Sequence, residues 1–481
     1  MTISWKVSEK KIAYDPTWTG PLNIKRKAEN IPFTVAYYLF VGLWIGVAGY
    51  AYLAGDVSKI EEDDDFTIEC EQFVASEWWI VLTVFLLGTF WSILFLALLR
   101  VTAKPMVYTA IALIFIIIGL AAFGSACALI FERTRGTFAS FFVCTLLLII
   151  FIWAYMTKSK FIPVTCEIIR EAVKQVSAIF FFPLVFIYTM AYYALAIIFT
   201  YFIMEIWVHL ASIAIIEGYV PIHLYFCEII NFIALIWINC HMWGIYRLSV
   251  AGSYGTWYWA TNKREVPLIT TLRFIYIAVR YHIGPVAFGS LILTVCFILR
   301  MLISIICSSA GTDDPNANPV TCLFRSCLLG CYAAVSCLET IVESITGLSF
   351  VYIALHGGGF IDAARESFNM FRRNFLKVTI LSQIVRILCF VAMVLISILT
   401  ILVFWGLVSS QSITLKERQI VLSLCILGIV VLVGLMLEPL SIAVDTIFTC
   451  VLEDFEMNGD TNKPYHMSDK LKQLVLENRL E

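Results

Sequence analysis

The sequence predicts an all-α membrane protein, a polytopic bundle of about ten transmembrane helices with both termini in the cytoplasm. Hydrophobic residues make up 60% of its 481 residues, and charged residues only 14%. Nearly uncharged stretches recur along the chain, and about 20 such residues in a helix cross a hydrocarbon core about 30 Å thick. Lysine and arginine are also concentrated in alternate connecting segments, as expected for a chain that crosses a membrane repeatedly.

Nine apolar stretches predict membrane spans from length and lack of charge. They cover residues 32–55, 78–99, 105–131, 137–156, 178–210, 226–248, 283–306, 376–407 and 419–447. A tenth candidate, 322–353, contains Arg325, Glu339 and Glu343. Hydropathy alone leaves open whether this stretch crosses the membrane or lies at its interface.

The distribution of positive charge favours the tenth crossing. With ten spans and an inside N-terminus, the cytoplasmic segments hold 25 of the lysines and arginines, counting Arg247 and Lys377 at the inner ends of their spans, and the outer loops hold five. Without the tenth crossing the last two spans would invert, and their flanking charges would violate the positive-inside rule. We therefore expect a cytoplasmic segment at 1–31, a transmembrane domain at 32–451 and a cytoplasmic tail at 452–481.

Two connecting segments have distinctive patterns. Residues 157–177 mix apolar and charged residues at roughly helical spacing, which predicts an amphipathic helix on the inner membrane surface. The acidic run from Glu61 to Asp65 lies in the first outer loop, where it is either a solvated loop or a vestibule that attracts cations. The net charge of −2 and the lack of a long basic block argue against a nucleic-acid partner.

The remaining motifs favour neither an enzyme nor a cofactor. His356-Gly-Gly-Gly359 matches an oxyanion-loop pattern, but the chain has no GxSxG nucleophile elbow to accompany it. Most of the 15 cysteines lie in apolar spans as small hydrophobic residues, so we expect no metal site and no cofactor. Cys70 lies in one outer loop, while Cys307 and Cys322 flank another, and they could form a disulfide if those loops face an oxidising compartment. The polar N-terminal segment lacks the features of a cleaved signal peptide.

Candidate substrate-binding residues are polar or aromatic groups inside or beside the spans. A charge at the centre of a span costs about 2.5 to 3.5 kcal/mol on insertion scales, so such groups need a partner or a function. Aromatic faces also attract quaternary ammonium ions, which cannot donate hydrogen bonds. The candidates are Tyr201, Glu205, Trp237, Asn239, His241, Trp243, Tyr246 and His282.

Two simpler interpretations stay open for these residues. Glu205 lies near the outer end of its span and could reach interfacial water. The tryptophans and tyrosines could form the usual interfacial belt, although Trp237 and Asn239 lie nearer mid-span. Small residues after His282 predict close helix packing or a hinge, and they are Gly284, Pro285, Gly289 and Ser290.

Several motifs in order along residues 163–474 resemble the choline transporter-like family. They are Ala251–Trp259, Arg280–Gly284, Ala287–Ser290, Cys337–Glu339, Phe360–Asn374, Val444–Asp445, Leu452–Asp454, Asn458–Asp460 and Pro464–Met467. The resemblance implies ten spans, cytoplasmic termini and transport of choline, with ethanolamine handled by some members. This chain departs from the family in a short first outer loop, in Gly357-Gly-Gly-Phe360, and in Cys240, where some members carry a carboxylate.

The leading hypothesis is a carrier for choline or a related organic cation, working by alternating access through an aromatic-lined site. The alternatives are a lipid scramblase or channel, and a membrane scaffold that transports nothing. We expect an integral membrane protein with the plasma membrane as the default location, although an organelle membrane is possible. The expected partners are a small organic cation and the lipid bilayer; the sequence does not determine the oligomeric state.

Overall fold

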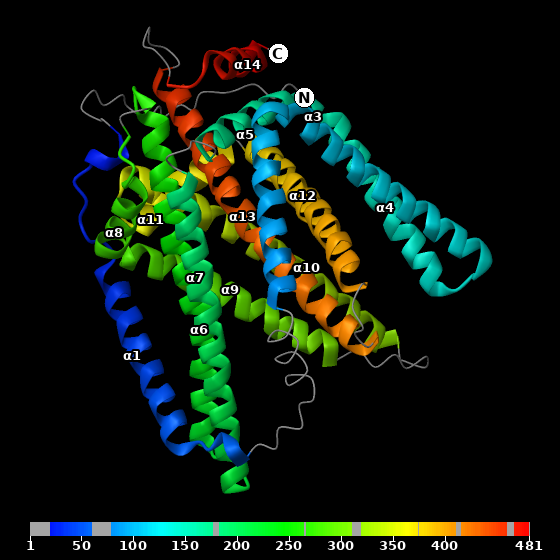
Figure 1. Ribbon diagram of the computed structural model, residues 1–481, viewed down its shortest axis with the longest axis vertical. Coiled ribbons are helices and arrows are strands. Elements are labelled where there is room, and N and C mark those ends of the chain that lie inside the picture. Colours follow the sequence, from blue (N-terminus) through cyan, green and yellow to red (C-terminus); the bar gives the residue numbers. More distant parts are fainter. Residues whose placement is uncertain are drawn as a thin grey trace. The chain divides into compact units, whose positions relative to one another are not determined.

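The computed structural model describes residues 20–59, 78–176, 182–263, 266–309, 319–373, 375–409, 415–458 and 466–480 (Figure 1). All regular structure in these ranges is helical. The chain divides into two compact units: among the described residues, 20–59 and 187–372 belong to one unit, and the residues of 78–186 and 373–480 belong to the other. The predicted all-α polytopic bundle is confirmed, whereas the side on which the termini lie stays a prediction.

The first unit is built from two stretches of the chain that flank residues 187–372 in sequence. Its elements are α3 (Trp78–Phe131), α4 (Arg135–Lys158), η3 (Ser159–Phe161), α5 (Ile162–Val176), the beginning of α6 (Phe182–Glu217), α12 (Phe375–Ser409), α13 (Leu415–Asn458) and α14 (Asp469–Leu480).

The second unit holds most of the predicted site residues. Its elements are η1 (Pro21–Asn23), α1 (Ile31–Ala54), η2 (Val57–Lys59), the rest of α6, α7 (Ile222–Trp259), α8 (Thr270–Tyr281), α9 (Ile283–Ser309), α10 (Pro319–His356) and α11 (Phe360–Arg373).

Within the described ranges, nine helices are long and apolar enough to cross a membrane, and one of them is a double span. Helix α3 has 54 residues, which at about 1.5 Å each would be far longer than one crossing requires. Its backbone leaves helical geometry at Thr102, three residues before Pro105. In Figure 1 the first part of α3 runs beside α13 and the second part beside α4. Two predicted spans therefore form one kinked helix, and the described helices supply ten apolar segments.

The weakest predicted span is a continuous helix. Residues 322–353 all lie in α10, and its stretch from Gly330 to His356 is apolar enough to cross. Glu339, one of the charges that interrupt it, forms an ion pair with Arg300 of α9. The charge of Glu339 was a main reason to place residues 322–353 at the membrane interface. Its pairing with Arg300 weakens that reason, because opposite charges partly compensate each other within a membrane.

Two helices continue well past the spans predicted from hydropathy. Helix α7 extends from the predicted end at Leu248 to Trp259, and most of the added side chains are buried. Helix α13 extends from Ile447 to Asn458. Hydropathy indicates where the apolar stretch of each helix ends. Both helices continue beyond that point because their next residues pack against protein.

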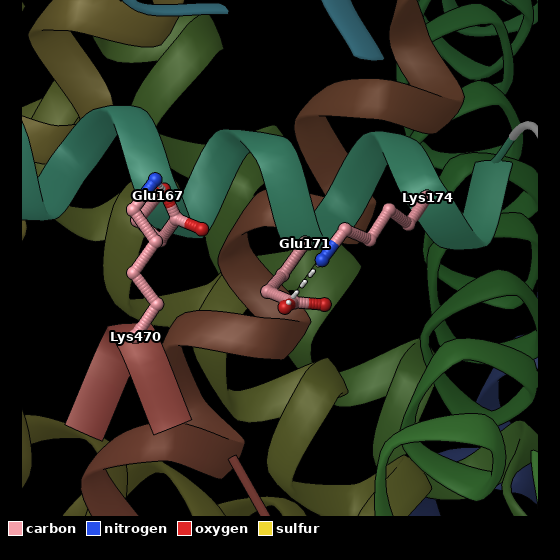
Figure 2. A network of polar contacts seen from close by, with 4 residues as sticks. All are labelled: Glu167, Glu171, Lys174 and Lys470. Carbon is pink, nitrogen blue, oxygen red and sulfur yellow. Dashed lines mark hydrogen bonds and ion pairs between the residues drawn. The ribbon is translucent and has the colours of Figure 1, made fainter. Parts of the chain in front are cut away.

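Helix α5 lies within the segment predicted to be an amphipathic helix, and it packs as an element of the first unit. Its apolar residues, among them Ile168, Ile169 and Ala172, are buried, and the helix contacts α3, α12, α13 and α14. Its charged residues form ion pairs at its edge, from Glu171 to Lys174 (2.9 Å) and from Glu167 to Lys470 of α14 (3.1 Å) (Figure 2). A position on the inner membrane surface stays a prediction.

The C-terminal residues also pack onto the first unit. The Asp454 carboxylate accepts hydrogen bonds from the backbone N–H groups of His466 (2.8 Å) and Met467 (3.0 Å), which holds the start of the final segment against α13. Leu471 of α14 is fully buried. The Glu456 carboxylate pairs with Arg373 at 3.1 Å. The sequence described this segment only as a short polar tail.

Candidate substrate site

The best-formed group of predicted site residues lies where α1, α7 and α9 meet in the second unit. Trp237 of α7 is buried, and its indole N–H donates to the Ser290 hydroxyl (3.2 Å) and to the carbonyl of Ala287 (3.3 Å) on α9. The Ser290 hydroxyl in turn donates to the same Ala287 carbonyl at 3.0 Å. Small residues on α9 allow this approach, as predicted for close helix packing in lipid.

Rings from α1 complete this group. Tyr37 meets Trp237 edge-on with 5.5 Å between ring centroids, and Phe40 lies 4.8 Å from the same indole. Tyr37 also stacks on the imidazole of His241 at 4.0 Å. We call Tyr37, Phe40, Trp237, His241 and Ser290 the Trp237 cluster.

Sequence reasoning missed the contribution of α1 to this cluster, although a signal was present. Phe33, Tyr37, Phe40 and Trp44 recur at spacings of four, three and four residues, which places four rings on one helix face. In the structure Trp44 is buried beside the cluster and donates to the Asn231 side chain at 3.0 Å.

His241 is a buried polar group without a partner in the described part of the chain. Its side chain is only 6% exposed, and neither ring nitrogen makes a hydrogen bond there, with Nδ1 fully shielded. A neutral imidazole offers one donor and one acceptor. Leaving such groups unpaired in the interior costs about 1 to 3 kcal/mol. A ligand that forms a hydrogen bond with the His241 ring would therefore remove this cost.

The other aromatic candidates on α7 face different neighbours. Trp243 contacts Phe350 of α10 (6.1 Å between centroids) and lies 5.3 Å from the Arg247 guanidinium. Tyr246 stacks on Tyr192 of α6 at 4.5 Å and lies in a group of tyrosines. The Asn239 amide donates to the carbonyl of Leu235 in its own helix, at 2.7 Å. These three candidates on α7 therefore lie in three different surroundings.

Glu205 and Tyr201 lie away from the Trp237 cluster. The Glu205 carboxylate is exposed and accepts a hydrogen bond from the Tyr52 hydroxyl at 2.8 Å. Tyr201 is 64% exposed. Tyr52 follows Tyr37 by 15 residues in α1, so at about 1.5 Å per residue Glu205 is about 20 Å along that helix from the cluster. The structure does not bring these two residues to one chamber with Trp237.

His282 belongs to a buried cationic contact at the opposite end of α1. The Arg26 guanidinium donates to His282 Nε2 (3.0 Å) and to the carbonyls of Ile353 (3.0 Å), Ala354 (2.6 Å) and Pro21 (3.1 Å). Burial, aided by the arginine charge, lowers the pKa of His282 to about 3. The imidazole is therefore neutral at physiological pH, with Nε2 as the acceptor. Sequence reasoning singled out His282 but missed its partner Arg26.

The predicted packing or hinge residues contact this same end of the unit. A Cβ atom at Gly284 would lie 2.5 Å from the carbonyl oxygen of Glu29 and 2.6 Å from that of Asn30. Asn30 adopts a left-handed conformation (φ 53°), and its side chain accepts from the N–H of Phe360 at 2.9 Å. At Gly289 a Cβ would lie 2.6 Å from the Phe360 ring. Close packing thus accounts for both glycines, while a hinge at Gly284, Pro285, Gly289 and Ser290 stays a prediction.

Other predicted features fall outside the described residues or away from the cluster. The acidic run 61–65 and Cys70 lie outside the described residues, as does the side chain of Cys322, whereas Cys307 is a free thiol. Within the described part of the chain, no group of three histidine, cysteine or acidic side chains is placed to hold a metal ion. A shallow depression lined by Leu129, Ile130, Arg133, Thr134 and Phe138 lies at the α3–α4 turn and includes none of the predicted site residues.

Comparison with known proteins agrees with the resemblance seen in the motifs. The chain is 29% identical to choline transporter-like protein 1 of Caenorhabditis briggsae over 261 residues, which are 52% of this chain and 32% of that protein. It is 30% identical to choline transporter-like 2 of Drosophila melanogaster over 258 residues, 53% of this chain and 32% of that protein. It is 27% identical to choline transporter-like protein 4 of Xenopus laevis over 271 residues, 54% of this chain and 37% of that protein.

These alignments cover about a third of the length of the curated relatives. The sequence model of the plasma-membrane choline transporter family matches residues 141–456, about two thirds of the chain. That range contains α7, α9 and α10, and with them most of the candidate site. The chain is an integral membrane protein that belongs to the plasma-membrane choline transporter family.

Proposed function

We propose that this protein is a plasma-membrane carrier for choline or a related small hydroxylated organic cation, such as ethanolamine. The observation that carries the proposal is the Trp237 cluster, in which three aromatic rings contact one another and one of them, Tyr37, stacks on an imidazole without a hydrogen-bond partner in the described chain. The names of the relatives support choline as the first substrate to test.

The rings supply the attraction for the ammonium group. Each aromatic face contributes about 0.5 to 2 kcal/mol toward a nearby cation. Tyr37, Phe40 and Trp237 come from two helices, α1 and α7, so a cation between them would be held by both. This arrangement suits a quaternary ammonium, which presents methyl groups and no hydrogen-bond donor.

His241 supplies a polar contact of the kind that a hydroxyl group needs. Its ring nitrogens lack partners in the described chain while the neighbouring groups are aromatic. A substrate hydroxyl both donates and accepts a hydrogen bond, so it can pair with either tautomer of the imidazole. We therefore assign recognition of the hydroxyl end to His241 and of the ammonium end to the rings.

The cluster as described is closed. Tyr37 and His241 are stacked 4.0 Å apart, which leaves no space for a cation between their faces. Entry of substrate requires α1 to move relative to α7, so that the rings separate and then close around the cation. Such a movement is the local event expected of a carrier that works by alternating access.

Uptake of radiolabelled choline into proteoliposomes tests the proposal. Purified protein should take up choline faster than empty liposomes do, and Trp237→Ala should lower the rate at equal protein incorporation. The matched control is Trp153→Ala, since Trp153 is 65% exposed on α4 in the other unit. Uptake no faster than in empty liposomes would overturn the proposed function and favour the scramblase or scaffold alternatives.

A second measurement tests the role of His241. Ethyltrimethylammonium has the charge of choline but lacks its hydroxyl group. Wild-type protein should prefer choline to this analogue, and His241→Phe should remove the preference while both cations are still transported. An unchanged preference in the variant would refute the assignment of the hydroxyl contact.

A further inference from the structure

Helix α10 carries two carboxylates in its apolar stretch, and these two groups have different partners in the structure. Glu339 and Glu343 are one helical turn apart in the apolar stretch Gly330–His356. Ionised groups at such a depth face protein, water or a counter-ion rather than hydrocarbon. The question for each carboxylate is therefore which positive group it meets.

Glu339 is satisfied within the protein. Its carboxylate forms an ion pair with Arg300 of α9, and both side chains are partly buried. The Arg300 guanidinium also lies 5.1 Å from the ring of Phe297. This pair accounts for one positive and one negative charge and links α9 to α10 at that level.

Glu343 has no such partner in the described part of the chain. It makes no ion pair or hydrogen bond there, and its side chain is exposed. It lies thirteen residues from either end of the apolar stretch, which places it at the middle of the span. An exposed carboxylate at this depth needs water or a cation beside it.

Arg247 of α7 also reaches α10 near Glu343, but its contacts are with other groups. Arg247 of α7 donates from Nε to the carbonyl of Gly347 at 3.2 Å, one turn along α10 from Glu343. Its guanidinium also contacts the Trp243 ring at 5.3 Å. Arg247 therefore places a positive charge one turn along α10 from Glu343, while its guanidinium bonds to a backbone carbonyl and contacts a ring.

A short chain of contacts connects Glu343 to the Trp237 cluster. Cys240 of α7 lies within electrostatic range of Glu343 and in contact with Thr294 of α9. The Thr294 hydroxyl donates to the carbonyl of Ser290 at 2.8 Å. Ser290 belongs to the cluster, so Cys240 and Thr294 lie between the carboxylate and the cluster in this chain of contacts.

We propose that Glu343 is the carboxylate that neutralises the transported organic cation at mid-membrane, and that the Arg300–Glu339 pair positions it on α10. The proposal rests on the proposed function and adds to it the source of the negative charge. It replaces Glu205, whose carboxylate is exposed and bonded to Tyr52, in that role.

The test compares charged and uncharged competitors of choline uptake in proteoliposomes. Glu343→Gln should raise the KM for choline by about tenfold or more, because the attraction between the carboxylate and the cation is lost. Competition by the uncharged carbon isostere of choline should be unchanged, and Glu343→Asp should recover much of the affinity. Glu217→Gln, at an exposed end of α6, is the matched control and should behave as wild type.

A double variant separates a role in charge from a role in folding. Adding Cys240→Asp to Glu343→Gln returns a carboxylate to the same region from α7, and choline affinity should rise again. The proposal is overturned if Glu343→Gln leaves the choline KM within about twofold of wild type, or if neither Glu343→Asp nor the double variant recovers it. If wild-type protein takes up no choline, the proposed function fails instead.

Discussion

Gly284 is the position at which a single added methyl group has the best-defined consequence. In Gly284→Ala the new Cβ would lie 2.5 Å from the Glu29 carbonyl oxygen and 2.6 Å from both the Asn30 carbonyl oxygen and the Thr34 hydroxyl. Two of these neighbours are backbone atoms that no rotamer change can move. The segment before α1 must therefore shift away from α9.

The expected loss of stability follows from two opposing effects. Overpacking of a tight contact costs about 1 to 3 kcal/mol, and backbone neighbours place this site toward the upper end. Replacing glycine by alanine in a helix returns up to about 1 kcal/mol. The net expectation is about 2 kcal/mol, and at about 2 to 4 °C per kcal/mol for a domain of 150 to 250 residues the Tm falls by about 4 to 8 °C.

The assay is thermal unfolding of the purified protein in one detergent, followed by the loss of the monodisperse peak in size-exclusion chromatography. The control is Gly46→Ala in α1, where a Cβ meets no atom within 4 Å. Gly46→Ala should leave the Tm unchanged or slightly higher. A Tm for Gly284→Ala equal to that of the control would show that the 29–30 segment is not packed against α9, and would refute the reasoning.

Three further predictions concern groups outside the membrane spans. Arg26→Ala should lower the Tm more than Arg26→Lys in the same unfolding assay, because the lysine retains the charge and part of the hydrogen bonding to buried carbonyls. An equal decrease in Tm for the two variants would argue against this contact. The pKa of His282 is lowered to about 3, so the unfolded chain binds the extra proton first as pH falls below about 6.5. Stability is then lost from that pH downward, by about 1 kcal/mol between pH 6.5 and 5.5, and His282→Asn should flatten this pH dependence of Tm. In the first unit, Leu471→Ala should speed limited proteolysis of the C-terminal segment, because Leu471 is fully buried; Lys470→Ala should have little effect, since its pair with Glu167 is partly exposed and worth at most about 1 kcal/mol.

The spans were predictable because hydropathy depends on local composition. Helix α1 begins at Ile31 and ends at Ala54, close to the predicted 32–55. The Thr102 kink in α3 was also foreseeable as two spans, since Arg100, Lys104 and Pro105 interrupt the apolar run. Helix ends inside protein were not predictable in this way, as the continuation of α7 to Trp259 shows.

The candidate site was predicted only in part. Trp237 of α7 and Ser290 of α9 were both singled out in the sequence and lie in one cluster, but the sequence patterns did not pair them and gave no means of separating Trp237 from Trp243 or Tyr246. From the sequence, residues one turn apart on a helix can only be assigned to the same face of that helix. Which neighbour each one meets depends on the crossing of other helices, and that information is nonlocal.

The sequence by itself determined that this chain lives in a membrane, how many apolar segments it has and which family motifs it carries. These properties follow from the residues of each segment taken alone. The tertiary structure decided which charges are compensated: Glu339 is paired with Arg300, His282 is held by Arg26, and Glu343 is left without an ion pair in the described chain. The physical reason is that the cost of a charge in lipid depends on its partner, and the partners lie on helices distant in sequence.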